Sequence, residues 1–146
     1  MKNNQKGFTL IELLAIIVIL AVIALITTPI ILNVVEESRK NAAVDKAYGV
    51  IEAVRLAYTQ NQVTTDPVTG KDTICVTYAS ETSETGCTVV YQKKVGSTNV
   101  SVSGDTPSSG MVMLNTQDGT LSIKKQLVFG DYKCNMGADT KITCTK

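Results

Sequence analysis

Four cysteines have the most evident chemistry in this sequence, and they fall into two local groups. Cys75 and Cys87 form one group, and Cys134 and Cys144 form the other. Neither spacing is the C-x-x-C type that zinc and redox sites favour. An even number of cysteines after a long apolar segment instead predicts two disulfides in an oxidising compartment. We expect each group to pair internally because this closes a short loop. All three connectivities are open, and buried free thiols in a reducing compartment are the alternative.

The residues that enzymes most often use are missing or scattered. The sequence has no histidine, which excludes Ser-His and Cys-His nucleophile pairs and His-ligated zinc within this chain. The acidic residues form no evident catalytic cluster, and no phosphate-binding or calcium-binding loop motif is present. The net charge of +1, from 14 basic and 13 acidic residues, gives no strong attraction to nucleic acid. We therefore expect no catalytic residue, no metal, no cofactor and no enzymatic activity.

A single carboxylate, Glu12, lies near the start of a long apolar run. The run 8–35 consists otherwise mainly of Ile, Leu, Val and Ala. As a helix it would span about 42 Å, which exceeds the ~30 Å hydrocarbon core of a bilayer. Lys2 and Lys6 precede it and favour a cytoplasmic N-terminus, with the rest of the chain outside. A carboxylate at the centre of a spanning helix costs roughly 2.5–3.5 kcal/mol, and less near an interface, so Glu12 needs an explanation.

Three ordinary interpretations of the apolar run compete. In a secretory signal, residues 13–26 would be the hydrophobic region, but the small residues suited to cleavage, near Ala21, lie inside the run. A plain signal anchor would leave the cost of Glu12 unexplained. A buried core helix is disfavoured by the length of the run.

The residues around Glu12 carry a resemblance to a known family. Residues 6–14 read KGFTLIELL, which resembles the prepilin cleavage and methylation motif of type IV pilins and type II secretion pseudopilins. As in that family, the motif follows a short basic leader and opens a long apolar helix.

This resemblance implies a role for each position of the motif. Residues 1–7 would be a leader that prepilin peptidase removes between Gly7 and Phe8, and the same enzyme would N-methylate Phe8. Glu12 would pair with the terminal amine of a neighbouring subunit during filament assembly. A charged partner offsets part of the cost of burying a carboxylate, and this amine exists only after cleavage. The alternative is an interfacial glutamate solvated by lipid headgroups.

One long helix, from about residue 9 to 61, must position these residues. We expect residues 8–35 to form its transmembrane or filament-core half. Residues 36–62 would form an amphipathic half that packs on a globular head. Pro29 removes one helix hydrogen bond and is expected to kink the helix, at a position where many pilins carry a proline. The expected core face comprises Val44, Ala47, Tyr48, Ile51, Val54 and Tyr58.

Residues 63–146 are expected to form an extracytoplasmic β-rich head. The turn sequence at residues 66–70 ends the helical part. Asp118-Gly119 predicts a hairpin, and residues 95–110 predict an exposed loop. The fold class is therefore α+β, with the long helix packed on a small antiparallel sheet, as in pilins. Strands are expected at 73–79, 88–94, 111–116, 120–127 and 141–145, which are rich in β-branched and aromatic residues.

The leading hypothesis is a type IV pilin-like structural subunit. It would be a single-pass protein of the bacterial cytoplasmic membrane, and after assembly part of a filament at the cell surface for adhesion, motility or DNA uptake. Its partners would be other pilins, prepilin peptidase and the pilus assembly machinery in the membrane. The alternatives are a pseudopilin of a type II secretion or competence system, and a membrane-anchored extracellular binding module. Lys93-Lys94 and Lys124-Lys125 are interpreted as solvated strand residues, so no specific nucleic-acid binding is predicted.

Overall fold

The computed structural model describes residues 7–64, 73–80 and 85–146. The chain divides into two compact units, Met1–Ser38 and Arg39–Lys146. The turn predicted at residues 66–70 lies outside the described residues.

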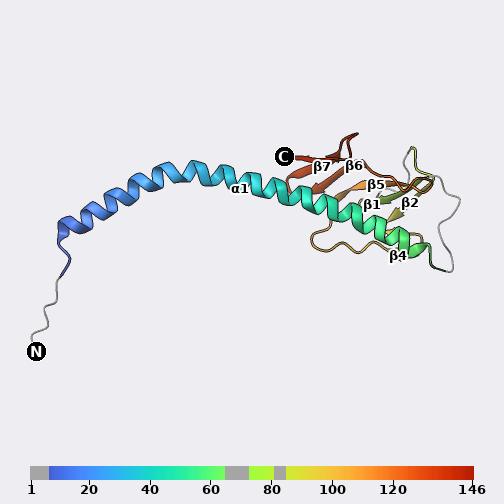
Figure 1. The fold of residues 1–146 in the computed structure, drawn as a ribbon, viewed down its shortest axis with the longest axis horizontal. Coiled ribbons are helices and arrows are strands. Elements are labelled where there is room, and N and C mark those ends of the chain that lie inside the picture. Colours follow the sequence, from blue (N-terminus) through green and yellow to red (C-terminus); the bar gives the residue numbers. More distant parts are fainter. Residues whose placement is uncertain (1–6, 65–72, 81–84) are drawn as a thin grey trace, which may run out of the picture. The chain divides into compact units, whose positions relative to one another are not determined.

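The predicted long helix is confirmed as α1, Leu10–Asn61 (Figure 1). Within the first unit, every described side chain is exposed, including those of the long apolar run. This part of α1 is long and apolar enough to cross a membrane, by length and composition. Side chains of this kind are rarely left in water over so large a surface, so they require a lipid or protein environment.

Pro29 lies inside α1 without ending it. Because proline has no N–H, the helix loses one hydrogen bond at this point. The two preceding threonines donate their hydroxyls to backbone carbonyls, Thr27 to Ile23 at 3.0 Å and Thr28 to Ala24 at 2.7 Å. These bonds satisfy both polar side chains within the helix, as an apolar environment requires. The kink at Pro29 stays a prediction.

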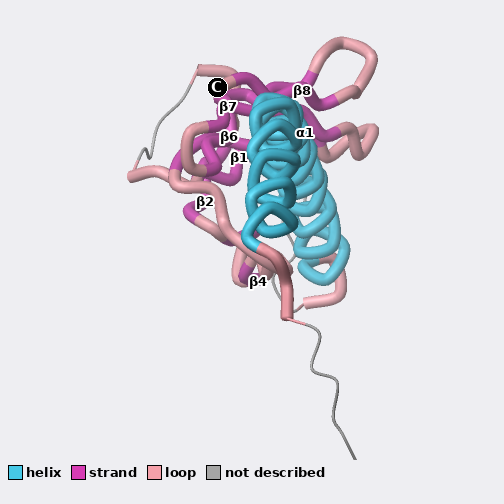
Figure 2. The backbone as a smooth tube through the Cα atoms, turned by 90° about the vertical axis from the view of Figure 1, so that its left-hand side faces the viewer, coloured by secondary structure: helices cyan, strands magenta, loops and turns pink. Residues whose placement is uncertain are grey.

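In the second unit, a six-stranded sheet has the order β2-β1-β5-β6-β7-β8, and β3 and β4 form a separate two-stranded sheet. The α+β fold class is confirmed, and the part of α1 that belongs to the second unit lies along one face of the sheet (Figures 1 and 2). The hairpin predicted at Asp118-Gly119 joins β5 to β6. The strands are β1 Thr73–Thr77, β2 Val89–Gln92, β3 Lys94–Val95, β4 Thr98–Asn99, β5 Ser109–Asn115, β6 Leu121–Phe129, β7 Tyr132–Met136 and β8 Ile142–Thr145.

The sheet differs from the prediction in three respects. It is mostly antiparallel, but β1 and β2 pair in parallel, with Ile74 opposite Val89. β7 was not predicted, because its sequence YKCNM lacks the β-branched residues that mark strands. The short strands β3 and β4 meet in a turn at Gly96, whose φ is +56°, so β4 occupies part of the predicted loop.

The helix packs on the sheet through a row of small side chains. Ala43, Ala47, Val50, Val54 and Ala57 recur at alternating four- and three-residue steps and are almost fully buried. The predicted face was therefore partly wrong, because Tyr48 is 40% exposed. Val44 and Tyr58 are half-buried at its edges. Small residues let the backbone of α1 approach the sheet closely, and this places the larger tyrosine at the margin.

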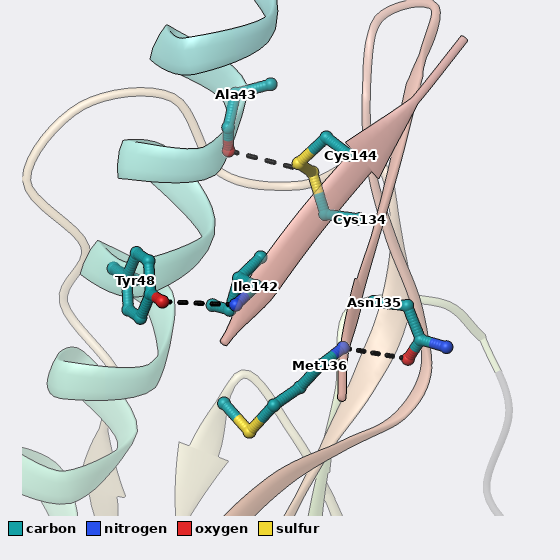
Figure 3. The surroundings of a disulfide bond; sticks show 7 residues. All are labelled: Ala43, Tyr48, Cys134, Asn135, Met136, Ile142 and Cys144. Atoms are coloured by element: carbon teal, nitrogen blue, oxygen red, sulfur yellow. Dashed lines mark hydrogen bonds between the residues drawn. A yellow bond between two sulfur atoms is a disulfide. The ribbon is translucent and has the colours of Figure 1, made fainter. Parts of the chain in front are cut away.

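Tyr48 instead joins the helix to the edge of the sheet. β8 is an outer strand, and its Ile142 N–H donates to the Tyr48 hydroxyl at 3.1 Å (Figure 3). Beside this bond, the Cys134–Cys144 disulfide connects β7 to β8. The Sγ of Cys134 lies 3.7 Å from the carbonyl oxygen of Ala43. A disulfide sulfur carries no proton, so this is a packing contact. The end of the chain is thereby held against α1.

The second disulfide is Cys75–Cys87. Both bonds thus follow the pairing preferred from the spacing of the cysteines, and no cysteine is free. Cys75 is fully buried in β1, and its bond ties this strand to the segment immediately before β2.

Among the glycines that the structure describes, Gly110 in β5 is predicted to be the least tolerant of substitution. Its φ is +127°, and an added Cβ would lie 2.6 Å from the carbonyl oxygen of Gln126 and 2.8 Å from the Cα of Leu127. Gly110→Ala should lower the free energy of unfolding by roughly 3 kcal/mol, through backbone strain and overpacking together. Urea unfolding of the detergent-solubilised chain, followed by circular dichroism, measures this.

Gly119 provides the matched control. Its φ is +72°, but an added Cβ would meet no atom within 4 Å. Gly119→Ala should therefore cost only about 1 kcal/mol of strain. Equal losses in the two variants would contradict the proposed close approach of β5 to β6 at Gly110.

Candidate functional site

The predicted cleavage point lies immediately before α1. Gly7 is exposed, and a Cβ added there would meet no atom within 4 Å. Phe8 is 82% exposed. Both residues precede the first helical residue, Leu10, so no helical hydrogen bond needs to break for a peptidase to reach the bond between them. This accessibility is what a proteolytic processing site requires.

Thr9 and Glu12 form a reciprocal capping box at the start of α1. The Glu12 Oε2 accepts hydrogen bonds from the backbone N–H and the hydroxyl of Thr9, each at 2.8 Å. In return, the backbone N–H of Glu12 donates to the Thr9 Oγ1 at 3.4 Å. Such a box satisfies N–H groups that would otherwise have no partner at a helix start. The pattern Thr-x-x-Glu was visible in the sequence, and the sequence prediction missed its capping role.

The capping box also determines where the charge of Glu12 lies. The Thr9 N–H belongs to the peptide bond that joins Phe8 to Thr9, so the carboxylate lies close to the backbone of Phe8. A carboxylate has about four acceptor sites, and the two bonds from Thr9 leave capacity for another donor. If the chain began at Phe8, an ammonium group would stand one residue away from the bound N–H.

The residues of the head supply no comparable site. Among the described residues, no group of three His, Cys, Asp or Glu side chains is placed to hold a metal ion. The Tyr78 hydroxyl is buried, and burial raises its pKa to about 12, so it stays protonated at neutral pH. Lys93 and Lys94 lie at the junction of β2 and β3, whereas Lys124 and Lys125 lie within β6.

Of the predicted site residues, the structure thus brings Glu12 together with Thr9, places Gly7 and Phe8 beside them, and gathers the cysteines into two disulfides. Pro29 lies apart from Glu12 along α1. The Thr9 capping contact and the exposed Gly7–Phe8 bond define the candidate site.

Comparison with known proteins identifies this segment. Residues 2–28 match the family model of the prokaryotic N-terminal methylation motif. This is the prepilin cleavage motif of type IV pilin-like proteins, and it supports a type IV pilin-like or pseudopilin protein. No match was found among curated proteins or solved structures.

Proposed function

We propose that this chain is a type IV pilin-like structural subunit that prepilin peptidase cleaves between Gly7 and Phe8 and methylates at Phe8. The observation that carries this proposal is the methylation-motif match over residues 2–28, which runs directly into the exposed apolar part of α1. A peptidase motif explains the accessible bond, and filament assembly explains the apolar surface. No catalytic role for the head is needed.

The apolar surface of α1 is buried first in the membrane and then in the filament core. Before assembly, the first half of α1 lies in the cytoplasmic membrane, and the two leader lysines keep the N-terminus inside. In the filament, the same side chains pack against those of neighbouring subunits. Because the contact is head-to-tail and does not close into a ring, it extends into a filament.

Glu12 makes this transfer dependent on processing. In the precursor, the nitrogen of Phe8 is an uncharged amide. Cleavage converts it into an ammonium, which can neutralise the Glu12 carboxylate of a neighbouring subunit in the apolar core. In each subunit the capping box holds the Glu12 carboxylate against Thr9 of its own chain, and the acceptor capacity that remains is available to the ammonium of a neighbour. Other pilins and the membrane assembly machinery complete the system, and a pseudopilin would use the same chemistry.

The mature N-terminus tests the proposal directly. Mass spectrometry of the protein from its native host should show a chain that begins at Phe8 and carries one additional methyl group. A chain that begins beyond the apolar run would identify a conventional secretory signal, and the proposed filament mechanism would then be wrong.

A further inference from the structure

A cleft in the second unit is not part of the processing site. It has a volume of about 560 Å³, within the range of small-ligand sites. Its walls come from the 39–46 segment of α1, the loop before β5 and the turn between β6 and β7. Its apolar lining includes the buried side chains of Ala43 and Phe129. The charged residues that line this cleft, which we call the Arg39 cleft, are Arg39, Lys46, Asp105 and Asp131.

Two of these four charges neutralise each other. The Lys46 Nζ lies 2.7 Å from the Asp105 Oδ2. The hydrogen bond and charge of Lys46 lower the pKa of Asp105, so the carboxylate stays ionised at neutral pH and matches the lysine. Arg39 and Asp131 form no ion pair with another described residue. The cleft therefore offers one unmatched guanidinium and one unmatched carboxylate.

The position of Arg39 along the chain indicates which ligand the cleft can reach. The uncharged run 13–35 spans about 34 Å as a helix, close to the ~30 Å hydrocarbon core that it would cross with some tilt. Arg39 follows Val35 by one turn, about 6 Å along a helix and no more than about 14 Å of extended chain. The lipid headgroup layer extends about 5–8 Å beyond the hydrocarbon. In the inserted subunit, Arg39 therefore lies at or just beyond the phosphate groups of the outer leaflet.

We propose that the Arg39 cleft binds the headgroup of a zwitterionic phospholipid of the phosphatidylethanolamine type. This inference rests on the membrane insertion contained in the proposed function. Arg39 pairs with the phosphodiester, for which the guanidinium fork is well suited, and Asp131 accepts hydrogen bonds from the primary ammonium. An anionic headgroup without the ammonium would leave Asp131 unmatched and repelled. Lipid binding then holds the head at the membrane surface until assembly withdraws the subunit from the bilayer.

Native mass spectrometry of the full-length precursor tests this binding without requiring cleavage. The chain is reconstituted in nanodiscs of equal parts phosphatidylethanolamine and phosphatidylglycerol, and the lipids retained after release are counted. Wild type should retain phosphatidylethanolamine preferentially. Arg39→Gln should reduce that retention roughly tenfold, the effect expected from one charge-assisted hydrogen bond. Asp131→Asn should instead shift the preference towards phosphatidylglycerol.

The matched control removes one basic and one acidic side chain outside the Arg39 cleft. Lys141→Gln combined with Asp139→Asn alters the turn between β7 and β8, which does not line the Arg39 cleft, and should leave lipid retention unchanged. Equal retention of phosphatidylethanolamine by wild type and Arg39→Gln would overturn the proposal. So would an Arg39→Gln variant that keeps its lipid and loses only filament assembly, since the cleft would then contact a second copy of the chain.

The failure of the underlying function would look different. If the chain does not enter the nanodisc at all, both the proposed membrane subunit and the proposed lipid site are contradicted. A chain that enters, and whose Phe8 is methylated in the native host, but that shows no lipid preference contradicts the headgroup site alone.

Discussion

Replacing Gly7 by leucine should leave the protein as a full-length precursor in the membrane. A peptidase must hold the residue before the cleaved bond in a defined position. Misplacement of a reacting bond by about 1 Å can cost on the order of 100-fold in rate. Leucine adds four carbon atoms where this chain has no side chain. Pulse-chase labelling in the native host, with the precursor and the mature chain separated by mass, measures the loss.

Folding of the variant should be unaffected, because a Cβ at Gly7 would meet no atom within 4 Å. Gly7→Ala is the graded control and should be cleaved more slowly than wild type but faster than Gly7→Leu. Cleavage of Gly7→Leu at the wild-type rate would remove the assignment of this bond to prepilin peptidase.

Replacing Glu12 by alanine should abolish filaments while leaving the head folded. The ammonium of Phe8 would then enter the apolar core of the filament without a carboxylate. Removing one member of a buried ion pair costs roughly 3–5 kcal/mol, which corresponds to more than a 100-fold loss in affinity for each added subunit. Electron microscopy and the yield of sheared filaments measure assembly. Two intact disulfides and an unchanged circular dichroism spectrum verify the fold.

A second variant separates the charge of Glu12 from its capping role. A glutamine side chain at the third helical position can still accept a hydrogen bond from the backbone N–H of the N-cap residue. Glu12→Gln should therefore keep the contact with Thr9 but lose the negative charge. We expect this variant to fail in assembly as Glu12→Ala does. Normal filaments from Glu12→Gln would show that capping, and not pairing with an ammonium, is the function of this side chain.

The sequence alone predicted features that depend on neighbouring residues. The long helix, the hairpin at Asp118-Gly119 and the cysteine pairing all follow from short-range patterns, and the structure has each of them. Features that depend on tertiary packing were missed. Tyr48 fits the spacing of a core residue, but the close approach of Ala43 and Ala47 moves it to the margin. The parallel pairing of β1 with β2 likewise depends on the path of the chain between the two strands, which no local sequence pattern predicts.

The same distinction holds for the sites. Gly7, Phe8 and Glu12 lie within one short motif, so the roles proposed for them could be inferred without coordinates. The Arg39 cleft brings together three segments that are widely separated in the sequence, around Arg39, Asp105 and Asp131. None of these residues is unusual in its local context, and only the fold places their charges around one space.

The local disulfides affect how the protein reaches its final form. The two bonded pairs are separated by 12 and 10 residues, and the first pair lies entirely before the second along the chain. If the head crosses the membrane with its N-terminal end leading, as the proposed function implies, Cys75 and Cys87 can form their bond before Cys134 emerges. Cys134 then finds only Cys144 as a free partner. The order of emergence therefore favours the native connectivity. Oxidative maturation of the head should consequently need a thiol oxidant but no disulfide isomerase.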